Sequence, residues 1–478
     1  MEIRDLEPKI VWNNFTKLNN VPRPSKKEER VIVFAKEFGE NLGLQTYVDV
    51  VGNVIISKPA TAGMENRKMV VLQSHLDMVC QKNSDTEFDF DTQGIEMLID
   101  GDWVTANGTT LGADNGMGVA AIMSLLESTD IPHPALEALF TIDEETGMTG
   151  AFGLEPGVLK ADILLNLDTE DDDEFSIGCA GGIDTNTKYN YTEEPSSGIA
   201  YAITVKGLKG GHSGMDIHLQ RGNANKIMNR LLWNSDAYEL RIAEINGGSL
   251  RNAIPRESFA TIAVKDESYL QEFESRVQEI KDEFSVSDGG LKIEITAVDL
   301  PQKVMSKSDV FKLTNTIYAL HNGVYRMSMT IEGLVETSSS LARVIVKDGE
   351  FNTQSLQRSS LETAKMDIAH TVGASFQLMG CDVEHTGSYP GWEPNSNSEI
   401  LDLMKGKYNA LYNEDPKVMA CHAGLECGIL GEIYPNWDMI SFGPTIRNPH
   451  SPDEKVKIDT VAKFWTLLKD VLKDIPVK

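Results

Sequence analysis

Short apolar runs alternate with a helix-like segment in the first part of the chain. Four runs have the short, continuous apolar pattern of buried strands: "NVIISK" (53–58), "KMVVLQSHLDMV" (68–79), "ALEALFTI" (135–142) and "DILLNLD" (162–168). The segment "GADNGMGVAAIMSLLES" has a Gly-rich turn and then apolar positions three and four residues apart, which predicts a helix. Apolar strands alternating with helices predict an α/β core.

The N-terminal part, residues 1 to about 50, has a helical pattern with a break at "VPRPSKKEER". In this break Ser25 is followed three residues later by Glu28. That spacing predicts a capping box that opens the next helix.

The middle of the chain has a different pattern. Polar and apolar residues alternate in "TNTKYNYTEE", "GIAYAITVKGL", "RESFATIAVK" and "GLKIEITAVDL", with polar helices between them. This α+β pattern predicts a domain at 188–384 that interrupts one α/β domain formed by residues 1–187 and 385–478. No internal repeat or low-complexity tract is evident.

Composition and charge exclude several partners. The chain has 478 residues, a formal net charge of −28 and five scattered cysteines without CxxC spacing. Such an acidic surface repels phosphate backbones, and scattered cysteines are typical of a reduced, cytoplasmic protein. Residues 1–15 lack the apolar core of a signal peptide, and no apolar run reaches the ~20 residues that span a bilayer. We therefore expect a cytoplasmic protein with no nucleic-acid or membrane partner.

His75 and Asp77 lie two residues apart on a predicted strand, in "SHLDMV". Side chains at i and i+2 of a strand project from the same face. A histidine that binds a metal usually has a carboxylate on its other ring nitrogen. The pair fits a metal ligand with its orienting partner, and it also fits a hydrogen-bonded pair without a metal.

Two further acidic sites follow predicted turns or strands. Asp114 lies in a Gly-flanked turn, where it fits either a helix N-cap or a carboxylate presented at the edge of the sheet. Asp143, Glu144 and Glu145 directly follow a buried strand. Neighbouring residues of an extended chain face opposite ways, so we expect Glu144 and Glu145 to have different roles, one binding a metal and one acting as a free base. A solvated acidic turn is the alternative.

Asp168 ends the run "ILLNLD", and His450 lies in the loop "SFGPTIRNPHSPDE", where it also fits an exposed loop histidine. Four of the acidic or histidine-bearing sites fall at predicted strand ends, where open α/β sheets bind their ligands. Histidines with carboxylates suit zinc, manganese or cobalt, and two neighbouring metals need a shared carboxylate. Competing chemistries lack their motifs, because the chain has no P-loop, no dinucleotide fingerprint and no GxSxG elbow.

The motifs "SHLD", "GADNG", "DEETG", "NLD" and "HSPDE", in this order, resemble those of the dinuclear-zinc peptidase family of aminoacylases, glutamate carboxypeptidases, and di- and tripeptidases. Within that family, "GGHSGMDIH", "LRNAIPRE", "HAGLECG" and the long insertion are most similar to the aminoacyl-histidine (Xaa-His) dipeptidases. The resemblance implies a zinc-peptidase-like catalytic domain with a mixed β-sheet flanked by helices, interrupted by an α+β lid or dimerisation domain.

The resemblance also implies a binding site for two divalent metal ions, zinc in the first place and cobalt or manganese as alternatives. His75 and Asp168 would bind one metal, and Glu145 and His450 the other. Asp114 would bridge the two metals and be followed by a cis peptide bond.

The remaining roles follow from the same resemblance. Asp77 would orient His75, Glu144 would be the general base, and His212 in "KGGHSG" would stabilise the oxyanion, within its own subunit or across a dimer. By position, the substrate-binding residues would be Asn252, Arg358, His422 and Glu426. Arg358 suits a terminal carboxylate through bidentate pairing, and Glu426 suits a free α-amine.

The activity implied is that of a cytoplasmic metallopeptidase that cleaves Xaa-His and related dipeptides with a hydroxide held between two metals. A tripeptidase, an aminoacylase or a carboxypeptidase of the same family is the nearest alternative. A deacetylase acting on N-acyl groups and a catalytically inactive binding protein are two others. The inserted domain implies a homodimer by resemblance.

Overall fold

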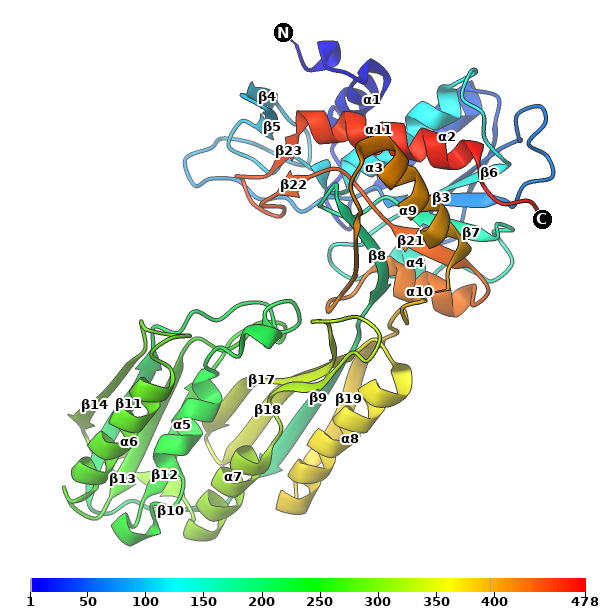
Figure 1. The fold of residues 1–478 in the computed structure, drawn as a ribbon. Coiled ribbons are helices and arrows are strands. Elements are labelled where there is room, and N and C mark those ends of the chain that lie inside the picture. The colour runs from blue at the N-terminus through cyan, green and yellow to red at the C-terminus, as the bar shows by residue number, and fades with distance from the viewer. Residues whose placement is uncertain (1, 396) are drawn as a thin grey trace. The chain divides into compact units, whose positions relative to one another are not determined.

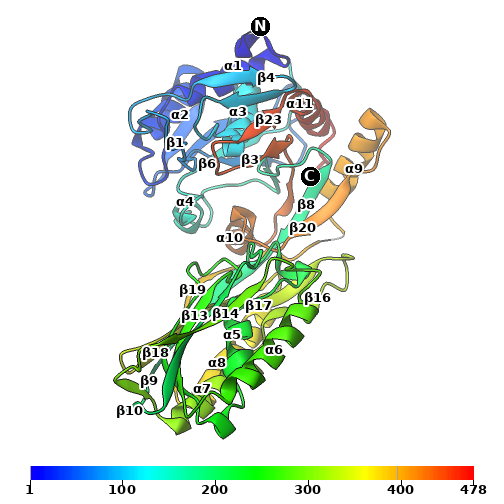
Figure 2. The same ribbon diagram turned by 90° about the vertical axis from the view of Figure 1, so that its left-hand side faces the viewer.

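The chain folds into two compact units, shown as ribbons in Figures 1 and 2. The computed structural model describes residues 2–395 and 397–478. Unit 1 comprises Met1–Gly178, Trp392–Ala420 and Leu425–Lys478, and unit 2 comprises Cys179–Gly391 and Cys421–Gly424. An α/β unit and an α+β unit are present, as the hydrophobic pattern predicts.

Unit 1 contains an eight-stranded mixed sheet, a four-stranded antiparallel sheet and surrounding helices. The eight strands, in sheet order, are β1 (Gln45–Val48), β2 (Val54–Lys58), β6 (Leu136–Thr141), β3 (Val70–His75), β7 (Ile163–Asn166), β21 (Asp438–Ser441), β8 (Glu174–Cys179) and β20 (Lys417–Cys421). The smaller sheet has β22 (Ile446–Arg447), β23 (Lys455–Lys457), β5 (Trp103–Ala106) and β4 (Met97–Asp100). The helices are η1 (Ile3–Asp5), α1 (Lys9–Asn19), α2 (Glu29–Asn41), α3 (Ala113–Glu127), α4 (Thr149–Phe152), α9 (Glu399–Tyr412), α10 (Glu426–Ile433) and α11 (Ile458–Lys473).

The centre of the large sheet consists of parallel strands. Strand β3 pairs in parallel with β6 on one side and with β7 on the other. All three are buried along their whole length, which explains their continuous apolar sequences. Their carboxyl ends therefore lie at one edge of the sheet, where His75 is level with Thr141.

The predicted helix after the Gly-rich turn is α3, and its burial is nearly complete. Gly118 lets it lie close to the sheet, because a Cβ there would be 2.5 Å from the carbonyl oxygen of Leu167. The predicted capping box before α2 is wrong. The N-cap of α2 is Glu28, no side chain caps this helix, and the Ser25 hydroxyl instead donates to Asp77 Oδ2 at 2.7 Å.

Unit 2 contains a nine-stranded antiparallel sheet and four main helices. The strands are β9 (Gly181–Asn190), β11 (Ile199–Lys206), β12 (Arg241–Gly247), β13 (Ser258–Val264), β14 (Lys292–Val298), β16 (Gly323–Met327), β17 (Val335–Lys347), β18 (Glu350–Ser359) and β19 (Asp382–Tyr389). A separate pair is formed by β10 (Glu193–Pro195) and β15 (Lys303–Met305). The helices are α5 (Ala224–Leu232), α6 (Tyr269–Glu283), α7 (Lys307–Ala319), α8 (Glu362–Met379), η2 (Ile217–Leu219) and η3 (Asp236–Tyr238).

The sheet of unit 2 repeats one topology twice. Strands and helices β11-α5-β12-β13-α6-β14 form one βαββαβ half, and β9-α7-β17-β18-α8-β19 form the other. Each half has its strands in the same spatial order, and β12 and β17 join the halves. In Figures 1 and 2 the four helices cover the same face of the sheet, where one continuous apolar core lies. The sequence gives no sign of this repeat, because the first half is inserted after the first strand of the second.

None of the helices in the described part of the chain has the length and apolar character needed to cross a membrane.

Candidate metal centre

The carboxyl ends of the parallel strands bring the predicted ligands of unit 1 together. His75 is the last residue of β3, Asp168 follows β7, and Glu145 lies in the turn after β6. Asp114 lies at the start of α3, where its backbone and that of Asn115 are not helical. The peptide bond between these two residues is cis. No side chain caps α3, so the structure does not support the helix-cap interpretation of Asp114.

Asp114 presents one carboxylate oxygen to each of two imidazoles. His75 Nε2 lies 3.3 Å from Asp114 Oδ1 and 3.6 Å from Asp168 Oδ1. His450 Nε2 lies 3.2 Å from Asp114 Oδ2 and 2.9 Å from Glu145 Oε2. The five side chains therefore form two sets, His75 with Asp168 and His450 with Glu145, and each set also contacts one oxygen of Asp114.

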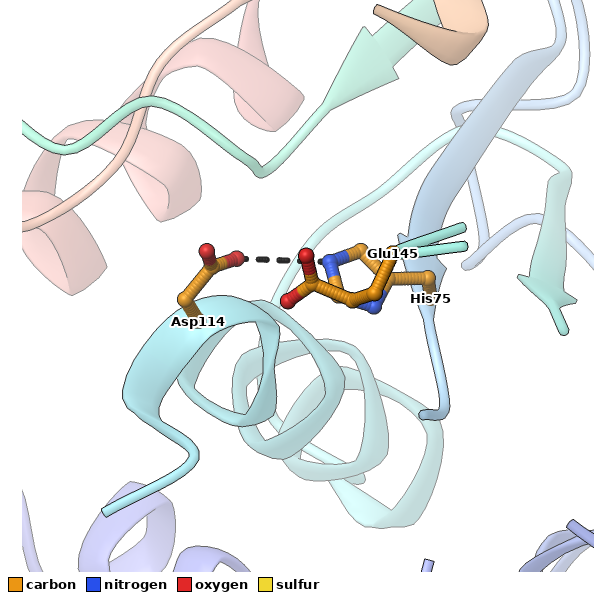
Figure 3. Close-up of side chains that lie close together, drawn as sticks. All are labelled: His75, Asp114 and Glu145. Atoms are coloured by element: carbon orange, nitrogen blue, oxygen red, sulfur yellow. Dashed lines mark hydrogen bonds and ion pairs between the residues drawn. The ribbon is translucent and has the colours of Figure 1, made fainter. Parts of the chain in front are cut away.

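This donor set fits a pair of metal ions. Figure 3 shows the side chains of His75, Asp114 and Glu145 converging, and one ligand atom from each lies within 4.8 Å of the other two. Ligand atoms about 2.0–2.2 Å from a tetrahedral zinc are about 3.3–3.6 Å apart, close to the distances seen here. In addition, Glu145 Oε1 is buried without a hydrogen-bond partner.

The excess of negative charge at the site also favours bound cations. Two histidines are surrounded by six buried or half-buried carboxylates: Asp77, Asp114, Glu144, Glu145, Asp168 and Glu426. Burial raises the pKa of Asp168 and of Glu144, and repulsion from neighbouring carboxylates adds to this shift although His75 opposes it. Unpaired buried anions are costly, and bound cations would remove that cost.

Asp77 connects His75 with the loop that carries the two glutamates. Its Oδ1 lies 3.3 Å from His75 Nδ1 and accepts the Glu144 amide at 3.1 Å, while Oδ2 accepts the Glu145 amide at 3.3 Å. Burial alone would raise the pKa of Asp77, but its interaction with His75 and the hydrogen bonds from Ser25 and the Glu144 amide leave it lowered. The side chain is thus an anion that can hold the His75 ring in place.

Glu144 and Glu145 do not lie on an extended chain, so the premise of the prediction that they face opposite ways is wrong. Both residues lie in a turn, which begins after Asp143 takes a left-handed conformation with φ of 53°. Asp143 itself stabilises the turn, because it accepts hydrogen bonds from the hydroxyls of Thr146 and Thr149. The two glutamates differ in their side-chain contacts. The Glu145 carboxylate contacts the His450 ring, whereas the Glu144 carboxylate accepts no hydrogen bond within the described residues.

Two residues that support the ligands were missed. Asn115 donates to Asp168 Oδ1 and, at 2.7 Å, to the carbonyl of Leu167. The Glu454 carboxylate accepts the amides of the four residues 111–114 at 2.7–3.2 Å, so it fixes the loop of Asp114. Both stand inside quoted motifs, "GADNG" and "HSPDE", which is the only signal the sequence offers.

Glu426 lies in unit 1 and is 1% exposed. Its Oε2 accepts hydrogen bonds from Gln73 and from Thr141, both at 2.6 Å, and its Oε1 has no partner. Burial raises its pKa to about 7, with His75 opposing the shift. The free oxygen can accept one more donor.

The other predicted residues, His212, Asn252, Arg358 and His422, lie in unit 2. Arg358 is 4% exposed and donates to the Tyr389 hydroxyl at 2.7 Å, and its Nε has no partner. No ion pair joins it to a carboxylate in the described chain, which is unusual for a buried guanidinium.

His212 faces Arg358 with its Nε2 atom 3.4 Å from the guanidinium. Its Nδ1 accepts the amides of Gly214 and Met215, so in the neutral ring the proton is on Nε2. Burial and the charge of Arg358 lower the pKa of His212 to about 4. Two donors thus lie 3.4 Å apart, an arrangement that suits an oxygen of an anion.

His422 and Asn252 border this cluster. His422 Nε2 lies 2.7 Å from the Ser338 hydroxyl. Burial, and to a smaller extent the charge of Arg358, lower the pKa of His422 to about 3. Asn252 is exposed, and its backbone carbonyl accepts a hydrogen bond from the Ser213 amide at 2.8 Å. The structure therefore brings His212, Arg358 and His422 together and holds Asn252 next to the His212 loop.

Known proteins resemble this chain along its whole length. The profile of peptidase family M20/M25/M40 matches residues 71–474. The cytosol non-specific dipeptidase of Escherichia coli (strain K12) is 44% identical, with both chains fully covered. The crystal structure of aminoacylhistidine dipeptidase from Vibrio alginolyticus is also 44% identical, with a TM-score of 0.93 over 100% of this chain and 99% of that one. Aminopeptidase PepT from Bacillus cereus shares the fold, with 16% identity, a TM-score of 0.58 and coverage of 98% and 99%.

Proposed function

Because the chain belongs to peptidase family M20/M25/M40, we propose that it is a cytoplasmic, metal-dependent dipeptidase that hydrolyses Xaa-His and related dipeptides. Two relatives with 44% identity over their full length are dipeptidases by name, one cytosolic and one acting on aminoacylhistidine. The order of motifs from "SHLD" to "HSPDE" agrees with that assignment.

The observation that carries this proposal is the sharing of Asp114 between two imidazoles. His75 and Asp168 would hold one divalent ion with Asp114 Oδ1, and His450 and Glu145 would hold the other with Asp114 Oδ2. Zinc is the first candidate, because mixed imidazole and carboxylate sets suit it, and cobalt or manganese would fit the same set. When bound, such a pair supplies a Lewis acid and lowers the pKa of a coordinated water.

Glu144 would act as the general base. It lies next to the proposed ligand Glu145, and its side chain has no hydrogen-bond partner among the described residues, so its carboxylate is available to take a proton from water and return it to the leaving amine. Asp77 would hold both the His75 ring and the backbone of Glu144. One carboxylate thereby couples ligand and base.

The cluster of unit 2 would bind the charged end of the substrate. Arg358 would pair with the peptide carboxylate, and His212, through its Nε2 proton, would donate to the oxyanion. Asn252 and His422 would line the same site, and Glu426 of unit 1 would meet the free α-amine with its unpaired oxygen. Residues 188–384 would form the lid domain, and a homodimer is part of the proposal by resemblance, to be measured by light scattering.

The test is a substrate panel on metal-stripped protein that is reloaded with zinc, manganese or cobalt. We expect chelator-sensitive cleavage of Xaa-His dipeptides, weaker cleavage of tripeptides and none of N-acyl amino acids. Preferred cleavage of tripeptides or N-acyl amino acids would refute the dipeptidase assignment. Full metal binding with no hydrolysis of any substrate would instead favour an inactive binding protein.

A further inference from the structure

The loop between α1 and α2 contains a buried arginine that touches two of the metal-ligand loops. Arg23 is 1% exposed. Its Nη1 donates to the carbonyls of Leu76 and Asp77 at 3.0 and 2.9 Å, and its Nη2 donates to the carbonyl of Gly112 at 2.6 Å. One guanidinium therefore ties the backbone next to His75 to the backbone next to Asp114, which are otherwise distant in sequence.

Two glycines of the Asp114 motif make room for this guanidinium. A Cβ on Gly116 would lie 2.8 Å from Arg23 Nη2, and a Cβ on Gly112 would overlap the same atom. Gly112 also has a φ of 70°, which other residues rarely adopt. The glycine spacing of "LGADNGMG" thus matches the shape of the Arg23 side chain.

Two more side chains of the same loop reach the third ligand loop. Ser25 donates to Asp77 Oδ2 at 2.7 Å, on the carboxylate that also holds the Glu144 and Glu145 amides. Glu28 Oε1 accepts the Asp143 amide at 3.1 Å. The backbone of the loop also contacts the segment that follows His75, because the Met78 amide donates to the carbonyl of Arg23 at 3.1 Å.

We propose that Arg23, Ser25 and Glu28 form a brace, a set of positioning residues that holds the loops of His75, Asp114 and Glu145 at the separation two metals require. The proposal rests on the metal-dependent function proposed above. The brace lies outside residues 71–474, the part that matches the family profile. None of the three side chains is among the five proposed metal ligands, so each acts through the residue it holds.

The chemistry of Arg23 fits positioning better than charge pairing. All four of its hydrogen bonds go to uncharged acceptors, the three carbonyls and Asn19 Oδ1. Burial lowers the pKa of Arg23, and the carboxylates of Glu454 and Asp77 oppose that shift through their charge, with no direct ion pair to the guanidinium among the described residues. A rigid, planar fork with several donors can fix three carbonyls at once, and a lysine cannot reproduce that geometry.

The experiment measures metal affinity and kinetics in paired variants. In Arg23→Lys and Ser25→Ala, metal affinity, measured by competition with a chromophoric chelator, should fall about 10–100-fold, the usual cost of losing a residue that orients a ligand. We expect kcat for a dipeptide to fall with it while KM changes less than threefold, because the brace does not contact substrate. Ser25→Thr, which keeps the hydroxyl, should restore both values.

Arg30→Lys is the matched control, since Arg30 is exposed on α2 and, among the described residues, donates only to the Asp91 carbonyl. Metal affinity within twofold of the wild type in both Arg23→Lys and Ser25→Ala would overturn the brace. Should Arg23→Lys fail to fold, the Ser25→Ala and Ser25→Thr pair decides alone. A wild-type protein that binds two metals yet cleaves no peptide would refute the proposed function, and the affinity comparison would still test the brace.

Discussion

Each unit contains a buried polar cluster, and the two clusters have opposite electrostatic character. In unit 1, hydrogen bonds to Asp114 and Glu145 raise the pKa of His450 to about 11, and carboxylates also raise that of His75 although burial opposes the shift. In unit 2, burial and Arg358 lower the pKa of His212 to about 4 and that of His422 to about 3. Burial acts alike on all four rings, so the neighbours decide the sign.

The difference teaches what each cluster can bind. Carboxylates that outnumber their histidines suit the first cluster to cations. A guanidinium without a carboxylate, beside neutral imidazoles, suits the second cluster to an anion. A dipeptidase needs both kinds of site, one for the metals and one for the carboxylate of its substrate, so the contrast can be tested from either side.

The largest effect should come from removing the shared carboxylate of unit 1. In Asp114→Ala neither metal keeps its full set of ligands, so we expect both metals to be lost and hydrolysis to fall to the background rate. Elemental analysis after dialysis measures the metals. Full metal occupancy in the variant would refute the bridging role.

Glu144→Ala should separate catalysis from metal binding within the same cluster. Loss of a general base typically costs about 10²–10⁴-fold in rate, while the five proposed ligands stay intact. We expect kcat to fall by that factor with two metals still bound, by elemental analysis and steady-state kinetics. The matched control is the exposed Glu155→Ala, and a Glu144 variant with near-wild-type turnover would show that another group is the base.

Arg358→Met should act on substrate affinity and leave the metals alone. A hydrogen bond to a charged group contributes about 1.5–3 kcal/mol, so KM for a dipeptide should rise about 10–100-fold. The wild type should also discriminate against the dipeptide amide, and the variant should lose that discrimination. Arg343→Met, at an exposed position of β17, is the control. Equal discrimination in wild type and variant would exclude Arg358 from carboxylate binding.

The smallest effect concerns pH and His422, which is 5% exposed. Its folded pKa of about 3 lies below the ordinary value of 6.5, so below pH 6.5 the unfolded chain binds a proton that the folded chain does not. The free energy of unfolding should therefore decrease as the pH is lowered, by about 2 kcal/mol from pH 7 to pH 5 for this group.

Urea unfolding of metal-free protein at both pH values measures this difference, and His422→Gln should make the pH dependence smaller by the same amount. The exposed His370→Gln serves as the control. An unchanged pH dependence in His422→Gln would show that the pKa of His422 does not change on folding.

Much of the site could be predicted because its residues follow a local rule. His75 and Asp168 stand at the ends of apolar strands, and parallel strands bring their carboxyl ends to one edge. Ligand roles came from resemblance. The capping box at Ser25 failed because the helix begins later, at Glu29 with Glu28 as its N-cap. The Ser25 hydroxyl instead bonds to Asp77, a distant partner that local patterns do not show.

The sequence by itself determined the apolar strands, the helix after "GADNG", the change of pattern in the middle of the chain and the residue types of a metal site. Only the tertiary structure decided the sharing of Asp114, the turn that follows Asp143, the repeated halves of unit 2 and the supports of the Asp114 loop. Arg23 and Gly112 are 89 residues apart, and Glu454 and Leu111 are 343 residues apart. Such contacts depend on how the sheet and its loops close in space, which local hydrophobic periodicity does not encode.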